Sequence, residues 1–95
     1  MSDFTITTTP RFERLAIKLI KHHPEFRSTL NQARAILATD PHNRIHNYHI
    51  KKLEGVPHGD GQWRLALGRF RFRYDVANHI VLLSRCGLRR EDTYR

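Results

Sequence analysis

Residues 69–76 alternate between charged and apolar side chains, in the order Arg-Phe-Arg-Phe-Arg-Tyr-Asp-Val. Successive side chains of a β-strand point to opposite faces, so this order predicts a strand with one apolar and one charged face. The residues expected to face a core are Phe70, Phe72, Tyr74 and Val76, and those expected to face outward are Arg69, Arg71, Arg73 and Asp75. The pattern therefore predicts a sheet with one buried face and one basic face.

Two further strands are expected beside this one. In Trp63–Leu67 every second residue is apolar, whereas Arg64 and Ala66 point the other way. Asn78-His79 is typical of a hairpin turn, and residues 80–83 are apolar on both faces, as in a central strand covered on both sides. We expect Gly87 to mark the end of that last strand.

The first half of the chain predicts a short strand and two helices. Residues 4–8 suit a strand, and Thr9-Pro10 supplies a helix cap and a proline for the first turn. Apolar residues at helical spacing predict one helix ending at Pro24 and a second over residues 24–38. A short extended segment over residues 48–53 and a mobile surface loop over residues 57–61 follow.

The expected fold class is α+β, with a two-helix hairpin packed on one face of a small, mostly antiparallel sheet. The expected order of elements is βααβββ, with one extra short strand allowed. A chain of 95 residues suffices for one compact domain, so we expect a single domain spanning residues 1–95.

The charge of the chain indicates a polyanionic partner. Seventeen Lys and Arg residues against nine Asp and Glu give a net charge of +8. Nucleic acid is the first candidate partner, ahead of an acidic protein and an anionic membrane surface. The sequence has no apolar run of the ~18 residues that a membrane span needs and no signal-peptide pattern, so we expect a cytoplasmic protein.

Cysteine and histidine usage argues against metal or disulfide chemistry. Cys86 is the only cysteine, and we expect it to be a small buried core residue. The seven histidines lack the spacing of a metal site, so we expect neither a metal nor another cofactor.

Four segments of the second half resemble the successive signatures of RelE-type toxins, in the RelE/ParE toxin superfamily. They are Lys51-Lys52-Leu53-Glu54-Gly55, Gly61-Gln62-Trp63-Arg64-Leu65, Gly68-Arg69-Phe70-Arg71-Phe72-Arg73-Tyr74 and Gly87-Leu88-Arg89-Arg90-Glu91-Asp92-Thr93-Tyr94. The resemblance implies a RelE-like fold and the toxin of a bacterial type II toxin–antitoxin system. Such toxins are messenger-RNA interferases, endoribonucleases that cut mRNA on the ribosome and thereby inhibit translation.

The resemblance also implies the partners and the catalytic residues. The partners would be a cognate antitoxin, the ribosome and mRNA, with DNA reached only through the antitoxin and no membrane involved. Arg71 matches the arginine that contacts the scissile phosphate, Arg64 matches a catalytic basic residue, and Tyr94 matches the terminal tyrosine. Arg89 matches the arginine after the final glycine, with Arg90 as the alternative. Further residues expected to bind RNA are Lys51, Lys52, Arg69, Arg73, Arg90 and Arg95.

Metal-independent RNA cleavage needs a base for the 2′-hydroxyl, cations for the phosphorane and an acid for the leaving oxygen. We expect Arg64 and Arg71 to point to the same side of neighbouring strands and to clamp one phosphate. Ala66 stands where the best-known ribosome-dependent members have a second lysine, and arginine is a poor base. The candidate general bases are His58 and His49, with Lys51 and Lys52 as alternatives.

Two other functions remain open at the level of sequence. ParE-type relatives inhibit DNA gyrase by binding, and a catalytically weak member can act as the nucleic-acid-binding half of a toxin–antitoxin repressor complex. The run of residues 89–94 favours the ribonuclease branch, whereas Ala66 weakens it.

Overall fold

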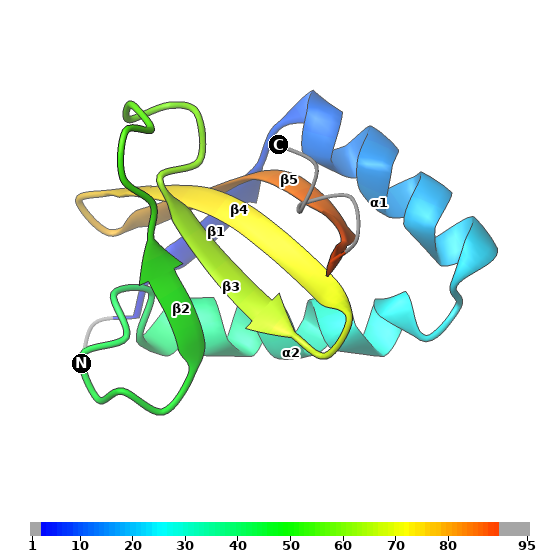
Figure 1. Ribbon diagram of the computed structural model, residues 1–95, viewed down its shortest axis with the longest axis horizontal. Coiled ribbons are helices and arrows are strands. Elements are labelled where there is room, and N and C mark those ends of the chain that lie inside the picture. Colours follow the sequence, from blue (N-terminus) through cyan, green and yellow to red (C-terminus); the bar gives the residue numbers. More distant parts are fainter. Residues whose placement is uncertain (1–2, 90–95) are drawn as a thin grey trace.

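The computed structural model describes residues 3–89, which form a five-stranded sheet with two helices on one of its faces (Figure 1). The elements are β1 (Thr5–Thr8), α1 (Pro10–His22), α2 (Phe26–Thr39), β2 (His49–Lys52), β3 (Trp63–Leu67), β4 (Phe70–Ala77) and β5 (Ile80–Leu88). The α+β class and the helical hairpin are confirmed. The order of elements is βααββββ, because the short extended segment around residues 48–53 forms a strand of its own.

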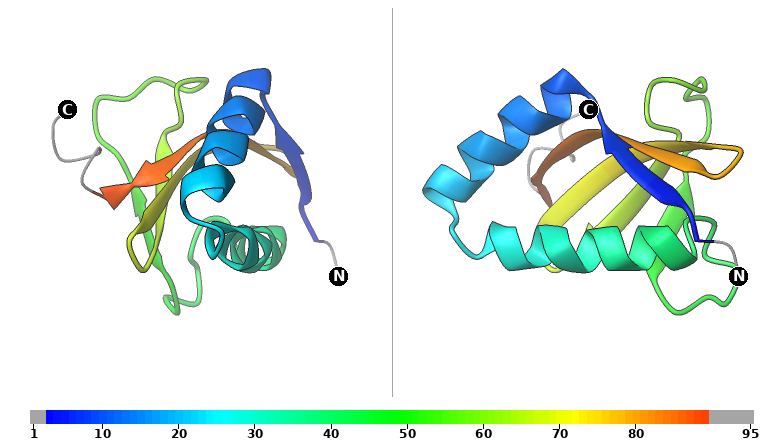
Figure 2. Two further views of the ribbon diagram at one scale, coloured as in Figure 1. Left: turned by 90° about the vertical axis from the view of Figure 1, so that its right-hand side faces the viewer. Right: turned by 180° about the vertical axis from the view of Figure 1, so that it is seen from behind.

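The strands lie in the order β1-β5-β4-β3-β2, with β1 parallel to β5 and the other neighbours antiparallel. Both helices lie on the same side of this sheet, as the left view of Figure 2 shows. We call the opposite side the outer face; no helix of the described residues covers it. The expectation that residues 80–83 are covered on both sides is therefore wrong at Ile80, which is 47% exposed.

The helices begin and end close to where their capping residues predict. The Thr9 hydroxyl accepts a hydrogen bond of 3.0 Å from the backbone N–H of Phe12, and Pro10 is the first residue of α1. Helix α2 begins at Phe26, two residues later than predicted, and ends at Thr39. Phe12 and Phe26 are fully buried and bring the two helices onto the sheet.

Aromatic packing between β4 and α2 forms the centre of the core. Phe70, Phe72 and Tyr74 of β4 are at most 3% exposed, as the alternation predicts. The Phe26 ring of α2 stacks on Phe72 at 5.5 Å between centroids and meets Phe70 edge-on at 5.0 Å. Cys86 is buried in the same core, which confirms its predicted role.

Strand β5 is longer than predicted because a bulge interrupts its alternation. The pairing of β4 with β5 shifts register between Arg73 and Tyr74, so Ser84 is an extra residue in β5. As a result, Leu83 and Cys86 are both buried although they are three residues apart. A strict two-residue period cannot detect this, and the strand continues to Leu88.

Replacement of Tyr74 by phenylalanine tests the polar contact within this core. The Tyr74 hydroxyl donates a buried hydrogen bond of 2.7 Å to the carbonyl of Pro41, and burial raises the pKa of Tyr74, with a further rise from the charge of Asp40. Tyr74→Phe leaves the Pro41 carbonyl without this donor, so we expect a loss of about 1–3 kcal/mol in the free energy of unfolding. Urea denaturation measures it, and an unchanged midpoint would show that the bond contributes nothing.

Candidate nucleic-acid interface

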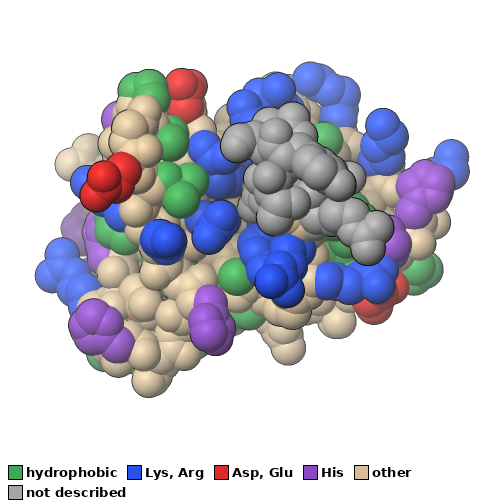
Figure 3. Space-filling view, in the orientation of Figure 1, with side chains coloured by type: hydrophobic (Ala, Val, Ile, Leu, Met, Phe, Trp, Pro, Cys, Tyr) green, Lys and Arg blue, Asp and Glu red, His purple; other side chains and the backbone are tan. Residues whose placement is uncertain are grey.

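The outer face carries two rows of side chains that run across β2, β3, β4 and β5. In the first row, which we call the cationic row, the paired residues are Lys51, Arg64, Arg73 and Arg85. In the second, which we call the Ala66 row, they are His49, Ala66, Arg71 and Gly87. Figure 3 views this face, and Lys and Arg side chains gather across its middle.

Arg64 and Arg71 share the outer face, as expected, but they are not directly opposed. Arg64 pairs with Arg73, whereas Arg71 pairs with Ala66. The two predicted clamp residues are therefore diagonal neighbours, for which separations of roughly 7–8 Å are usual. A phosphate held by both would lie across this diagonal.

The guanidinium of Arg71 is fixed at the end of the face near the β3–β4 turn. One of its nitrogens donates to the carbonyls of Gly68 at 2.8 Å and Phe70 at 2.9 Å. On either side of Arg71 in its row stand Ala66, with a single methyl group, and Gly87, with no side chain. Gly87 was expected to mark the end of its strand but lies within β5, opposite Arg71. Neither neighbour of Arg71 in this row has a side chain that extends beyond Cβ.

A buried carboxylate anchors the loop that precedes β3. Asp75 was expected to face outward into solvent, but it is 3% exposed because the loop lies over it. Its two oxygens accept hydrogen bonds from the backbone N–H groups of Gly61 at 2.9 Å and Gln62 at 3.1 Å. Arg73 donates through Nε to the carbonyl of Gly61 at 2.7 Å and through a terminal nitrogen to that of Asp60 at 3.0 Å. The loop predicted to be mobile is thus pinned to the sheet at its β3 end.

Gly61 is required at this anchor. Its φ is +80°, a conformation that other residues rarely adopt, and an added Cβ would lie 3.0 Å from Cβ of Arg73.

The charge of Asp75 depends on this loop. Burial raises the pKa of its carboxyl, but hydrogen bonds from the backbone N–H groups of Gln62, Gly59 and Gly61, together with the nearby charge of His58, outweigh burial and lower it. His58 therefore lies near Asp75, four residues along β4 from Arg71, which is roughly 13 Å.

His49 lies closer to the predicted phosphate site than His58. It is exposed at the start of β2 and pairs with Ala66, which in turn pairs with Arg71. His49 and Arg71 thus flank the Ala66 methyl group, with two strand spacings, or about 10 Å, between their Cα positions.

Lys51 and Lys52 point to opposite sides of β2. Lys51 is exposed in the cationic row. The Nζ atom of Lys52 lies 5.8 Å from the centre of the Trp63 ring, so this lysine contacts the side chain that packs against the core.

Arg69 and Arg89 lie at the end of the sheet where β4 begins. Arg69 precedes β4, and its guanidinium bonds to Glu25 at 3.4 Å and to the ring of His23 in the helical connection. Its expected position on the outer face is wrong. Arg89 is exposed directly after β5, and its backbone N–H donates to the carbonyl of Arg69 at 2.8 Å. The other predicted site residues, Arg90, Tyr94 and Arg95, lie outside the described residues.

Sequence reasoning missed Arg85, the fourth member of the cationic row. The bulge at Ser84 places Arg85 opposite Arg73, whereas simple alternation from Leu83 puts it on the core side.

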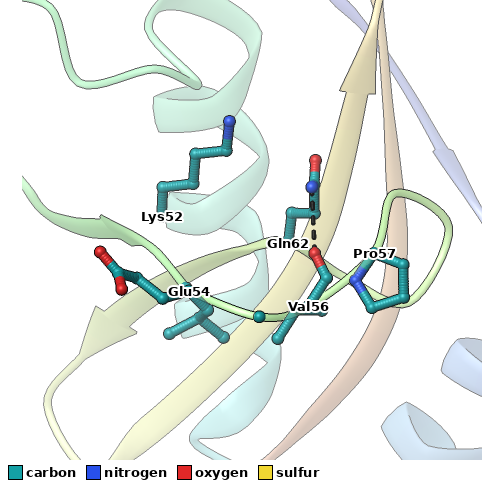
Figure 4. A pocket seen from close by; sticks show the side chains of 7 residues that line it. Lys52, Glu54, Val56, Pro57 and Gln62 are labelled. Carbon is teal, nitrogen blue, oxygen red and sulfur yellow. Dashed lines mark hydrogen bonds between the residues drawn. The ribbon is translucent and has the colours of Figure 1, made fainter.

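The loop between β2 and β3 forms a shallow hollow of about 740 Å³, in which the Gln62 amide donates to the carbonyl of Val56 at 3.0 Å (Figure 4). Its lining residues are Lys52, Leu53, Glu54, Gly55, Val56, Pro57 and Gln62.

Residues 3–89 contain no group of three or more His, Cys, Asp or Glu side chains placed to hold a metal ion. Neither α1 nor α2 is long and apolar enough to cross a membrane.

Replacement of Asp75 by asparagine tests the loop anchor. The lowered pKa of Asp75 means that its ionised form favours folding, so its contribution is present above its ordinary value of 3.8 and is lost as the pH falls through and below that value. We expect Asp75→Asn to lower the free energy of unfolding by about 2 kcal/mol near neutral pH. Urea denaturation from about pH 7 down to about pH 2 should show the gap between wild type and variant closing in acid. A gap that stays constant over this range would contradict the assignment.

Comparison with known proteins identifies the architecture. YafQ from E. coli strain BL21(DE3) matches with a TM-score of 0.67, covering 93% of this chain and 96% of that chain at 13% identity. The RelB-RelE antitoxin-toxin complex from Methanococcus jannaschii contains a chain that matches with a TM-score of 0.64, covering 93% of this chain and 94% of that one at 18% identity. No protein-family model and no curated protein sequence matches. The RelE-like fold that the sequence predicts is therefore confirmed, because the chain shares its fold with these two structures.

Proposed function

We propose that this protein is the toxin of a bacterial type II toxin–antitoxin system and that it cuts messenger RNA on the ribosome. The observation that carries the proposal is the Ala66 row, in which His49 and Arg71 stand on either side of Ala66. The cationic row lies beside it on the same outer face. Phosphodiester cleavage requires a base and several cations close to the reacting phosphate.

The proposed reaction is a transphosphorylation. His49 accepts the proton of the ribose 2′-hydroxyl, and the 2′-oxygen forms a bond to the adjacent phosphorus. The bond from phosphorus to the 5′-oxygen of the next nucleotide breaks, and that oxygen takes up a proton from water. Arg71 and Arg64 stabilise the negative charge that develops on the phosphorane. The products are a 2′,3′-cyclic phosphate and a free 5′-hydroxyl.

His49 fits the role of general base better than His58 does. A base has to reach the 2′-hydroxyl next to the phosphate that Arg71 holds. His49 lies in the same row as Arg71, whereas His58 lies near Asp75, roughly 13 Å along β4. Ala66 supports this assignment, because a longer side chain at that position would stand between His49 and Arg71.

Arg89 completes the proposed site at the end of β5. Arg89 is exposed at the end of β5, where it can contact a phosphate oxygen of the bound RNA. Tyr94, five residues further on, is proposed to stack on a base of the message.

The same proposal includes a cognate antitoxin and action in the cytoplasm. A chain of the RelB-RelE antitoxin-toxin complex shares this fold, and the charge of +8 favours a partner with an acidic segment.

Replacement of Arg71 by alanine tests the function directly. We expect Arg71→Ala to abolish mRNA cleavage, because the phosphorane loses its principal cation, while the free energy of unfolding changes by less than about 1 kcal/mol. Primer extension maps the cuts in one message, incubated either with translating ribosomes or without ribosomes. The matched control is Lys21→Ala, which removes an exposed cation from α1 and should leave cleavage unchanged.

A folded Arg71→Ala protein that still cuts at codon boundaries would refute this role. A wild-type protein that cuts no RNA but changes plasmid supercoiling in expressing cells would indicate gyrase inhibition instead.

Replacement of His49 by alanine tests the general base. We expect His49→Ala to slow cleavage about 10²–10⁴-fold, the usual contribution of a positioned base, and added imidazole to restore part of the rate. His58→Ala serves as the comparison and should have a much smaller effect. A larger loss for His58→Ala than for His49→Ala would reverse the assignment.

A further inference from the structure

We propose that the hollow beside Lys51 is a second phosphate site, which binds the phosphate next to the scissile one in single-stranded RNA. This inference rests on the proposed function and adds to it the path of the substrate. The hollow has a volume of about 440 Å³. Its lining residues are Lys51, Lys52, Leu53, Glu54, Val56, Arg64 and Arg73.

The charges around this hollow favour an anion. Four of its seven lining residues are cationic, and one, Glu54, is acidic. Lys51, Arg64 and Arg73 are directly paired across three adjacent strands, so their Cα atoms are about one strand spacing apart. A phosphate bound in this hollow would interact favourably with all three positive charges.

One wall of the hollow is held in place before any ligand binds. Two hydrogen bonds from the Arg73 guanidinium to the carbonyls of Gly61 and Asp60 fix its position. The Asp75 carboxylate holds the same loop from beneath through the N–H groups of Gly61 and Gln62. Because this cationic wall is already ordered, phosphate binding loses little conformational entropy there, which favours a specific site over diffuse attraction.

The distance between the Ala66 row and the cationic row fits one step of a nucleotide chain. Arg64 lies two residues from Ala66 on β3, which places the cationic row about 7 Å from the row that contains His49 and Arg71. Arg64 is the diagonal neighbour of Arg71, at roughly 7–8 Å, and Lys51 pairs with Arg64. A strand whose scissile phosphate lies over Arg71 can therefore place its neighbouring phosphate at the side of the hollow that Arg64 lines, next to Lys51. The 2′-oxygen must line up with the leaving oxygen for this reaction, and a single strand can adopt that geometry more easily than a stacked duplex.

Lys51 has no part in the proposed chemistry, so its removal should weaken binding without changing the chemical step. The probe is a short RNA oligonucleotide that carries a 2′-deoxy sugar at the scissile position and is therefore not cleaved. Its affinity is measured by fluorescence anisotropy over a range of salt concentrations. Matched oligonucleotides carry a neutral methylphosphonate in place of the phosphate on the 5′ or the 3′ side of the scissile one.

We expect Lys51→Gln to weaken binding of the fully charged oligonucleotide roughly fivefold and to reduce the salt slope by about 0.7, the value for one single-strand phosphate contact. One of the two methylphosphonate oligonucleotides should lose this sensitivity to Lys51→Gln. Lys51→Arg should restore binding, and Lys21→Gln on α1 should change it little. In the ribosome assay, Lys51→Gln should raise KM and leave kcat within about twofold.

Equal effects of Lys51→Gln and Lys21→Gln would overturn the phosphate site, as would unchanged sensitivity with both methylphosphonates. These outcomes are distinct from failure of the proposed function. A wild-type protein that cuts RNA without any specific effect of Lys51 refutes the phosphate site alone. Binding that depends on Lys51, in a protein that cuts no RNA, supports the phosphate site and refutes the nuclease.

Discussion

Strand β4 has opposite requirements on its two faces, and the arrangement of the molecule follows from them. Burial of Phe70, Phe72 and Tyr74 stabilises the fold. Helix α2 covers this face and contacts Phe70 and Phe72 through Phe26. Arg71, on the other face, would be costly to bury without partners, and no helix within residues 3–89 covers that face (Figure 2). The helices can therefore occupy only one side of the sheet, and the other side becomes a basic surface.

The carboxylate of Asp75 turns this surface into a shaped site. A buried carboxylate needs hydrogen-bond donors, and Asp75 obtains them from the backbone of the loop before β3. The loop in turn presents the carbonyls of Asp60 and Gly61 to Arg73. Arg73 thus has a structural role that sequence did not predict, and it also contributes charge to the hollow at Lys51.

Local patterns in the sequence predict the elements well, because alternation and helix caps are properties of neighbouring residues. Thr9 and Pro10 place the start of α1, and the apolar residues of β4 predict the core. Pairing between strands is a different matter. Alternation shows that Arg64 and Arg71 share a face, but register depends on the turn at Gly68, and the turn places Arg64 opposite Arg73.

Two further errors of the prediction from sequence also arise from contacts between residues that are far apart in the chain. The bulge at Ser84 arises where β5 pairs with β4, so a two-residue period does not predict that Arg85 lies on the outer face. Arg69 turns away from the outer face because Glu25, more than forty residues earlier, offers it an ion pair. Ala66 could be recognised as an unusual residue, but only the pairing of β2 with β3 shows that His49 is its neighbour.

The central claim is that RNA binds on the outer face, over the Ala66 row. Mapping of backbone amide shifts by NMR, with the uncleavable oligonucleotide added to isotope-labelled protein, measures this most directly. The account predicts the largest shifts in β2, β3 and β4, around His49, Lys51, Arg64 and Arg71, with little change in α1 and α2. Largest shifts on the helices, with an unperturbed outer face, would contradict it.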